Sequence, residues 1–343
     1  MKHLWTKLYI LLAILLLVTP SLGMLIFGPG GAAANEQLAA RPSLTDRDGG
    51  FNARVLSESA DYLADHFALR QQLVTVWSEL NARLLGSSPE EQVILGREGW
   101  LYFSPSLPDY TGQALSDQEL EALARHLKEL QSAAEARGAV FLFTVAPNKN
   151  SLCSQYMPAA YPDRHGESSI VRLLPYLEQY GVQYADLFSL PMPYYRTDTH
   201  WTAEGAAMAA DALLAALGRE SAYAAGPFST GDARPGDLYE MLYPTGKGSE
   251  AEILYGGPLR YTTQGDPKGG DAITIRCSGE GEGRLYCWRD SFGIALYPYL
   301  ADAFGESVFT RSTGYTLPDG EYDVYLLEIV ERNLGALLYH FEP

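Results

Sequence analysis

Two short segments, far apart in the chain, carry the residue types of a serine nucleophile and its base. "LYCWRDSFG" places Ser291 where an apolar strand is expected to turn into a helix, which exposes the hydroxyl and a backbone N–H. "RTDTHWTAEG" places Asp198 two residues before His200. A carboxylate at that spacing can bond the imidazole Nδ1 and leave Nε2 free to take a proton from serine. Together, the two segments predict acyl transfer through a serine.

Each segment also has a purely structural interpretation. Asp290 and Ser291 are residue types that cap the start of a helix. In the other segment, Thr202 can be the N-cap of the following helix while Trp201 enters the core. The chemical interpretation therefore depends on whether the two segments meet at one edge of the fold.

The composition excludes several classes of protein. Hydrophobic residues make up 47% of the 343 residues, enough for a sizeable core. Lys and Arg number 25 against 42 Asp and Glu, a net charge of −17, which argues against a nucleic-acid partner. A metal site would need further ligands, but His66 is distant in sequence and His126 lies on a predicted helix. The sequence predicts neither a metal nor a cofactor.

The N-terminus has the pattern of a membrane-targeting segment. Lys2, His3 and Lys7 precede the uncharged residues 8–28, a length that matches the hydrocarbon thickness of a bilayer. This pattern favours a membrane anchor over residues 1–28, and a signal peptide cleaved near "GGAAANEQ" is the alternative. Both interpretations place the rest of the chain outside the cytoplasm. Residues 29–50, rich in Gly, Ala, Pro and Asp, are expected to be a linker.

Strand and helix patterns alternate along residues 51–343. "AVFLFTVAP" (139–147) is an unbroken apolar run, typical of a parallel strand covered on both faces. The alternation predicts a three-layer α/β/α domain with a mostly parallel sheet, and residues 219–270 are expected to be a loop-rich insertion or cover. The expected helices span 51–86, 116–138, 168–181, 203–218 and 292–304, and the expected strands lie within 93–103, 139–147, 182–188, 283–290, 307–312 and 322–330.

Polar segments follow four of the expected strands. They are "PNKNS" after 147, "RTDTHW" after 188, "RDSFG" after 288 and "TRSTGY" after 309. In an open α/β sheet, functional residues gather at the carboxyl ends of the strands. We therefore expect these four segments to converge.

The motifs resemble those of the SGNH-hydrolase-like proteins related to alginate O-acetyltransferases, and more closely those of the bacterial DHHW family. "TDTHWT" and, much later, "RDSFG" carry the resemblance, which extends over nearly the whole exported portion. The supporting motifs are "NEQLAARPSL" (35–44), "DHFALR" (65–70), "ILGREGWLYF" (94–103), "PNKNSLCSQYMP" (147–158), "GDLYEML" (236–242) and "YDVYLLEIVERNL" (322–334).

The resemblance implies roles for individual residues. It makes Ser291 the nucleophile, His200 the general base and Asp198 the group that orients it. It offers Asn148 or Lys149 as a second oxyanion donor beside the Ser291 N–H, and Tyr297 and Arg311 as residues that hold a substrate or acyl donor. Arg289 departs from the Gly that many relatives carry before the "DSF" sequence, which leaves activity and substrate open.

The resulting functional hypothesis is an extracytoplasmic O-acetyltransferase or esterase that acts on an exported or cell-envelope polysaccharide. Water and a sugar hydroxyl would use the same residues, so the sequence does not separate the two reactions. By the resemblance, a membrane protein is the expected acyl donor partner. The alternative is a non-catalytic envelope protein of the same fold that binds glycan or scaffolds polysaccharide assembly.

Two further features admit two interpretations each. Asp65 and His66 could be a second functional pair, but a structural role is favoured because nothing adjacent supplies a nucleophile. Cys277 and Cys287 flank "SGEGEG" and could be bridged across a hairpin, whereas Cys287 could equally be a buried thiol within an apolar run.

Overall fold

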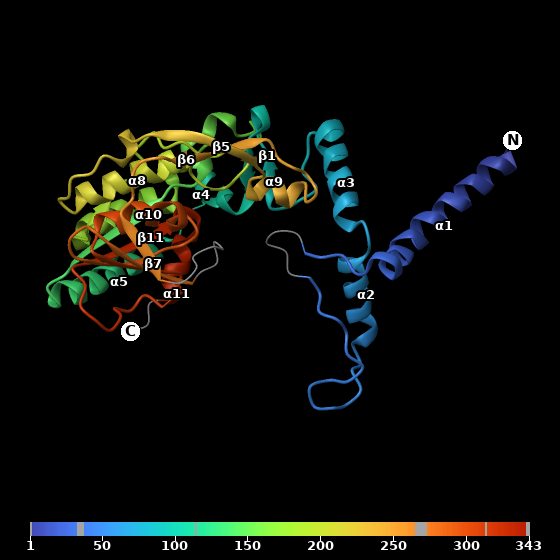
Figure 1. Ribbon diagram of the computed structural model, residues 1–343, viewed down its shortest axis with the longest axis horizontal. Coiled ribbons are helices and arrows are strands. Elements are labelled where there is room, and N and C mark those ends of the chain that lie inside the picture. The colour runs from blue at the N-terminus through green and yellow to red at the C-terminus, as the bar shows by residue number, and fades with distance from the viewer. Residues whose placement is uncertain (1, 33–37, 114, 265–272, 313, 341–343) are drawn as a thin grey trace. The chain divides into compact units, whose positions relative to one another are not determined.

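The computed structural model describes residues 2–32, 38–113, 115–264, 273–312 and 314–340. The chain divides into two compact units. The N-terminal unit comprises residues 1–93 and 237–248, and the α/β unit comprises residues 94–236 and 249–343. Figure 1 shows the elements of both units. Part of the expected linker, residues 33–37, lies outside the described residues.

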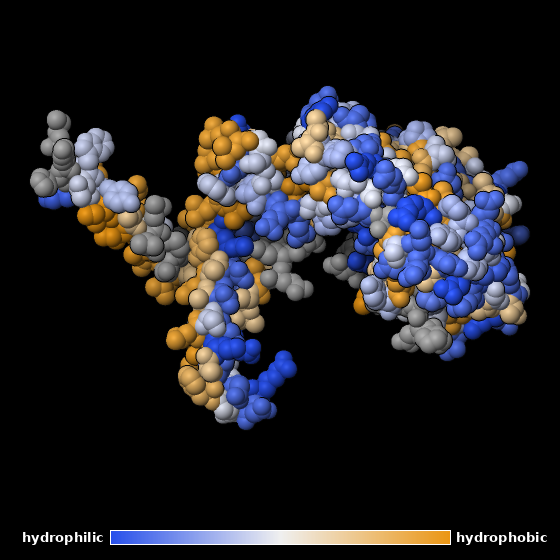
Figure 2. Space-filling view, turned by 180° about the vertical axis from the view of Figure 1, so that it is seen from behind, coloured by the Kyte–Doolittle hydropathy of each residue, from blue (hydrophilic) through white to orange (hydrophobic). Residues whose placement is uncertain are grey.

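The N-terminal unit is built of helices. The helix expected over 51–86 is broken in two, because Phe67 is extended and Leu69 has a left-handed backbone with φ of 66°. Figure 2 shows hydrophobic side chains exposed along the first helix. Trp5 and Leu25 are among the exposed residues of this helix. The helices of the unit are α1 (Lys2–Phe27), α2 (Val55–His66), α3 (Arg70–Leu85) and α9 (Asp237–Leu242).

Within the described residues, none of the helices is both long and apolar enough to span a lipid bilayer. The anchor or signal segment expected over residues 1–28 thus stays a prediction. Asp65 and His66 make local bonds in this unit. Asp65 Oδ2 accepts from the Ala39 N–H at 2.7 Å, and His66 Nδ1 lies 3.0 Å from the Tyr62 carbonyl oxygen while its ring stacks on Tyr62. These contacts fit the favoured structural role.

The α/β unit is organised around one sheet, in which seven of the described strands pair in the order β4-β3-β11-β9-β10-β8-β7. The strands from β4 to β10 are parallel, as expected, whereas β8 and β7 join antiparallel. The strands are β3 (Val140–Ala146), β4 (Tyr184–Ala185), β7 (Tyr261–Gln264), β8 (Thr274–Gly279), β9 (Arg284–Trp288), β10 (Glu306–Thr310) and β11 (Val324–Val330).

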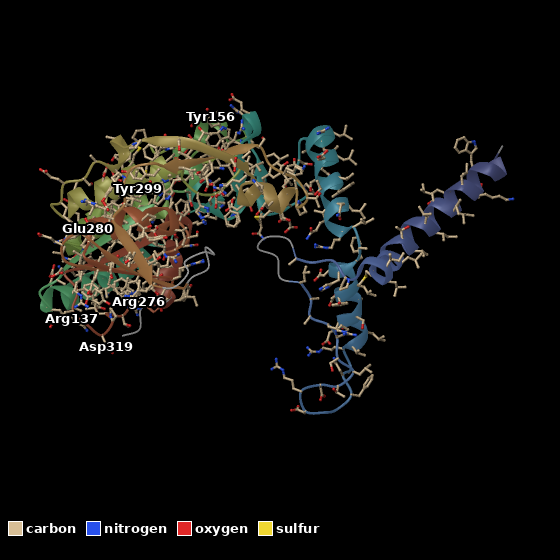
Figure 3. The ribbon with its side chains drawn as sticks, viewed as in Figure 1. Arg137, Tyr156, Arg276, Glu280, Tyr299 and Asp319 are labelled. Atoms are coloured by element: carbon tan, nitrogen blue, oxygen red, sulfur yellow. The ribbon has the colours of Figure 1, made fainter. Side chains whose placement is uncertain are left out.

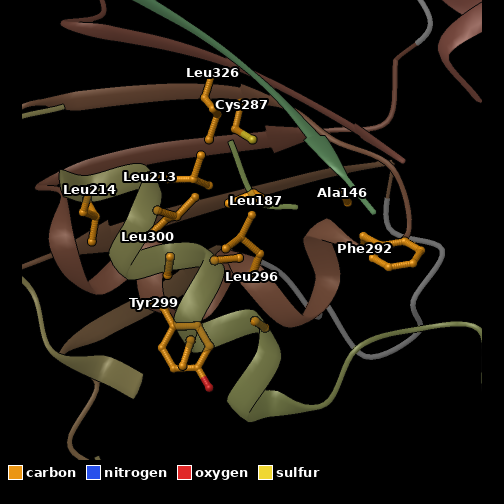
Figure 4. Packing of buried hydrophobic residues seen from close by; sticks show 14 of the residues in the cluster. Ala146, Leu187, Leu213, Leu214, Cys287, Phe292, Leu296, Tyr299, Leu300 and Leu326 are labelled. Atoms are coloured by element: carbon orange, nitrogen blue, oxygen red, sulfur yellow. The ribbon is translucent and has the colours of Figure 1, made fainter. Parts of the chain in front are cut away.

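Helices cover both faces of this sheet, which gives the expected three layers. Alternate residues of β11 point to opposite faces, so that Leu326 packs with one hydrophobic cluster and Leu327 with the other. Figure 4 shows Leu326 among Leu213 and Leu300 of the covering helices. Helices α8 (Ala203–Ala216) and α10 (Gly293–Ala303) contribute to the first cluster, and α5 (Asp117–Ala136), α7 (Ser169–Tyr180) and α11 (Leu337–His340) to the second.

Smaller elements complete the unit. Ser116 and Glu119 form the predicted capping box at the start of α5. At the N-terminal boundary of the unit, β1 (Val93–Leu95) pairs with β2 (Leu101–Phe103). Two further elements, α4 (Leu107–Tyr110) and α6 (Lys149–Leu152), are single turns of helix. Residues 219–270 are more than a cover: they hold β7 of the main sheet and a separate ribbon of β5 (Phe228–Arg234) and β6 (Glu250–Tyr255).

Of the two interpretations of Cys277 and Cys287, the structure shows buried thiols and not the bridge. All three cysteines lie within the described residues, and all are free and buried. Cys277 lies on β8 and Cys287 on β9, and β10 runs between these strands. The two cysteines therefore belong to strands that are not neighbours, and "SGEGEG" does not form the hairpin that the bridge required.

Candidate active site

Ser291, His200 and Asp198 form one hydrogen-bonded row in the α/β unit. His200 Nε2 lies 2.9 Å from Ser291 Oγ, and His200 Nδ1 lies 2.7 Å from Asp198 Oδ1. The same carboxylate oxygen accepts a bond from the His200 backbone N–H at 3.0 Å. When Nδ1 carries the ring proton and donates it to Asp198, Nε2 is the basic nitrogen that faces the serine hydroxyl.

The turn between β9 and α10 sets the position of Ser291, and Asp290 fixes this turn. Asp290 Oδ1 accepts from the Phe292 N–H at 2.9 Å, and Oδ2 accepts from the Val330 N–H of the adjacent strand at 2.7 Å. The capping interpretation thus applies to Asp290, whereas the Ser291 hydroxyl faces His200. The N-terminal end of α10 lies beside Ser291, where backbone N–H groups favour a developing negative charge.

The loop that carries Asp198 and His200 is closed at its base by a β-bridge between Tyr194 and Trp201. Trp201 is buried and packs edge-on against Phe292, with ring centroids 5.0 Å apart. Thr202 follows as the N-cap of α8. Both interpretations of this segment therefore hold: it caps a helix, and it directs His200 toward Ser291.

Lys149 lies behind this loop. Its ammonium group donates to the carbonyl oxygens of Tyr195, Arg196 and Asp198, at 3.1, 3.0 and 2.7 Å. Nζ also lies over the ring of Trp100, which stacks on Tyr156; Figure 3 labels Tyr156. The side chain is buried, and these three bonds tie Lys149 to the loop that carries Asp198 and His200.

Asn148 is also buried, and it faces a cluster of ionisable groups. Its backbone N–H donates to Glu331 Oε2 at 3.0 Å, and its Nδ2 donates to Asp109 Oδ2 at 3.3 Å. Glu331 bonds to His165 Nε2 at 2.7 Å and accepts from Ser151 Oγ at 2.6 Å. Burial, and next the charge of Glu331, raise the pKa of Asp109 to about 7.

Tyr297 lies on α10, and Arg311 follows β10. Tyr297 packs against the rings of Phe309 and Tyr261, at 5.6 and 6.2 Å. Arg311 is exposed just after β10, and its backbone N–H donates to the Ile273 carbonyl. Arg311 is exposed and Tyr297 is half-buried.

The sequence analysis missed two residues on the β5–β6 ribbon that contact the loop. Arg234 Nη1 donates to Asp198 Oδ2 at 3.1 Å. Glu250 accepts the backbone N–H groups of Arg196 and Thr197 and the Thr197 hydroxyl. The segment "EAEILY" (250–255) begins with alternating charged and small or apolar residues, as a strand does. This alternation was the signal in the sequence for a strand at this position.

The electrostatics of Asp198 follow from these partners. Burial alone would raise the pKa of Asp198, but hydrogen bonds from His200 and the charges of His200 and Arg234 outweigh burial. The net effect holds the pKa of Asp198 well below its usual range. At neutral pH the row therefore contains a buried, ionised carboxylate.

The sheet order and the covering helices form an α/β fold of the SGNH-hydrolase-like type. Residues 93–253 match the family model described as an SGNH hydrolase-like domain, acetyltransferase AlgX. The matched segment includes Asp198 and His200 and ends before Ser291.

Relatives of known sequence or structure agree with this class. The chain is 26% identical over 178 residues to the probable alginate O-acetylase AlgJ of Pseudomonas putida, a match covering 50% of this chain and 45% of that protein. Bacillus cereus PatB1 matches with a TM-score of 0.56 and 17% identity, over 71% of this chain and 98% of that one. A DHHW family protein from Eubacterium siraeum matches with a TM-score of 0.51 and 16% identity, over 72% and 97%.

These comparisons confirm the resemblance to the SGNH-hydrolase-like proteins related to alginate O-acetyltransferases. The structural matches, all at low sequence identity, show a shared fold. The chain spans less than half the length of the curated relative that it matches.

Proposed function

We propose that this protein is a serine-dependent acyl-transfer enzyme, an O-acetyltransferase or esterase that acts on an exported or cell-envelope polysaccharide. The distance of 2.9 Å between His200 Nε2 and Ser291 Oγ, with Asp198 behind the imidazole, is the observation that carries the proposal. The match to the AlgX-type acetyltransferase domain supports the same reaction class.

The first half of the reaction forms an acyl-enzyme. Ser291 Oγ attacks the carbonyl carbon of an acyl donor while its proton passes to His200 Nε2. Asp198 stabilises the resulting imidazolium through Nδ1. The Ser291 N–H and the N-terminal end of α10 stabilise the oxyanion. The bond to the leaving group then breaks, and the leaving group takes the proton from His200.

The second half transfers the acyl group. A sugar hydroxyl gives its proton to His200 and attacks the acyl carbon. The bond between Ser291 Oγ and the acyl carbon then breaks, and Oγ takes the proton back from His200; water in place of the sugar gives hydrolysis. Arg311 is exposed near the sheet end and is available to contact the donor or the acceptor. The net charge of −17 favours a neutral or amino-sugar polymer over a polyanion.

The proposal includes an extracytoplasmic location, and a membrane protein as the source of acyl groups. The uncharged residues 8–28 after Lys2 and Lys7 support export. A fusion of alkaline phosphatase to the C-terminus tests this location, because the phosphatase is active only when it is exported. An inactive, stably expressed fusion would contradict it.

The activity is tested with a soluble acetyl ester. Ser291→Ala should lower turnover by about 10³-fold or more. Ser151→Ala is the matched control, because the Ser151 hydroxyl donates to Glu331 and not to His200. A sulfonyl fluoride should label Ser291 in the wild type. Equal ester turnover by wild type and Ser291→Ala would remove Ser291 from the mechanism. If the protein binds glycan but shows neither turnover nor labelling, the non-catalytic scaffold is favoured.

Hydrolysis and transfer are separated by adding an acceptor. A neutral oligosaccharide should become acetylated while the release of free acetate falls, if a sugar hydroxyl competes with water for the acyl-enzyme. Free acetate release that is unchanged, with no acetylated sugar, assigns esterase activity.

A further inference from the structure

Both oxygens of the Asp198 carboxylate are held, and by different partners. Oδ1 accepts from the backbone N–H and Nδ1 of His200, and Oδ2 accepts from Arg234 Nη1 at 3.1 Å. The carboxylate is almost completely buried. Because a carboxylate can rotate about its Cβ–Cγ bond, a bond to each oxygen fixes the plane of the group. The orientation that serves His200 is thus set in part by Arg234.

Arg234 is itself held in place. Its guanidinium carbon lies 4.7 Å from the ring centroid of Tyr195, and the Tyr195 hydroxyl accepts the backbone N–H of Ile253 on β6. The Tyr195 carbonyl is one of the three that Lys149 binds. A planar guanidinium can stack on an aromatic ring and donate in its own plane at once, which a lysine ammonium cannot.

We propose that Arg234 is a positioning residue for acyl transfer, which aligns the Asp198 carboxylate with His200 from the β5–β6 ribbon. The inference rests on the proposed function of the Ser–His–Asp row. It gives the β5–β6 ribbon, which lies within residues 219–270, a part in the reaction.

The charge of Arg234 has a second consequence. Groups that face Asp198 include His200, Arg234 at the carboxylate, and the Lys149 ammonium at the backbone carbonyl. Loss of the Arg234 charge leaves the carboxylate more able to stabilise protonated His200. His200 then requires a higher pH to act as a base, so the acid limb of the pH–rate profile should move to higher pH.

Three variants test the proposal: Arg234→Gln removes the charge, Arg234→Lys keeps it without the planar group, and Arg284→Gln is the matched control. Arg284 also pairs with a carboxylate, Glu306 at 2.9 Å, and also lies over a tyrosine ring, that of Tyr322. With a soluble acetyl ester, Arg234→Gln should lower kcat roughly 10- to 100-fold with little change in KM. Its acid limb should move to higher pH. Arg234→Lys should restore the wild-type acid limb and part of kcat, and Arg284→Gln should change neither.

A measurement without turnover separates this inference from the proposed function. The pH midpoint of the His200 ring resonance, assigned by its loss in His200→Gln, should rise in Arg234→Gln and stay unchanged in Arg284→Gln. A folded Arg234→Gln protein with wild-type kcat and an unmoved midpoint overturns the inference, even if Ser291 is essential. If Arg234→Gln does not fold, Arg234→Lys decides, because a kcat equal to that of wild type would show that the planar group positions nothing. Failure of the proposed function would appear as unchanged turnover in Ser291→Ala.

Discussion

His200 Nε2 lies 2.9 Å from Ser291 Oγ although 91 residues separate them in the sequence. Ser291 follows β9, near the middle of the sheet, and His200 belongs to a loop that follows the edge strand β4. The loop between β4 and α8 is long enough to cross the carboxyl edge of the intervening strands. The parallel arrangement of β4, β3, β11 and β9 is what puts both residues at the same edge.

Asp198→Asn should keep the fold and lose most of the activity. The amide cannot accept the Nδ1 proton of His200 as the carboxylate does, and it can hold the imidazole in the wrong tautomer. We expect kcat to fall by about 10³- to 10⁴-fold with a small change in KM. Asp186→Asn is the control on the same loop, because the exposed Asp186 carboxylate accepts the Phe188 N–H. An Asp198→Asn enzyme with more than a tenth of the wild-type kcat would contradict the assignment.

Lys149→Met should destabilise the protein as well as the site. The substitution leaves three carbonyl oxygens, two of them in buried bonds, without their ammonium donor, which should lower the free energy of unfolding by about 3 kcal/mol. The loop that carries Asp198 then loses its support, so kcat should fall too. Denaturant unfolding and ester turnover measure the two effects, with the exposed Lys247→Met as the control. A stable variant with impaired turnover alone would instead favour a direct role for Lys149 in substrate contact.

Local sequence patterns predicted the Ser–His–Asp row but not the residues that hold it in place. Ser291 and His200 could be placed because each follows an apolar strand, and parallel strands share a carboxyl edge. Arg234 could not be placed, because β5 pairs only with β6, and the contact of this ribbon with the Asp198 loop depends on long-range packing. Strand order also depends on long-range packing, which is why the sequence left open whether Cys277 and Cys287 are bridged.

The buried cluster beside Asn148 should make stability depend on pH. The pKa of Asp109 rises from an ordinary value of 3.8 to about 7, first because of burial and then because of Glu331. A raised folded-state pKa means that the folded protein binds the proton more tightly. Its stabilising contribution is therefore present below about pH 4 and is lost as the pH rises through about 7.

Asp109→Asn removes this dependence, because an amide does not titrate and its oxygen can still accept from Asn148. The free energy of unfolding of the variant minus that of wild type should therefore be larger at pH 8 than at pH 4, by up to ~4 kcal/mol. Denaturant unfolding of both proteins at the two pH values gives this difference. Asp163→Asn is the control for a nearby exposed carboxylate. A difference between variant and wild type that is the same at both pH values would show that Asp109 is ionised throughout.

Thr202→Ala tests whether the helix entry and the catalytic loop act as one unit. Thr202 Oγ1 accepts the Gly205 N–H in the first turn of α8, and loss of such a cap costs about 1 kcal/mol. Ser116→Ala at the capping box of α5 is the matched control, because α5 carries none of the Ser–His–Asp row. Both variants should lose similar stability in denaturant unfolding. Thr202→Ala should also lose kcat severalfold, because Thr202 lies two residues after His200 and fraying of the cap loosens the imidazole. Equal kcat in the two variants would mean that the bridge between Tyr194 and Trp201 fixes His200 without the helix cap.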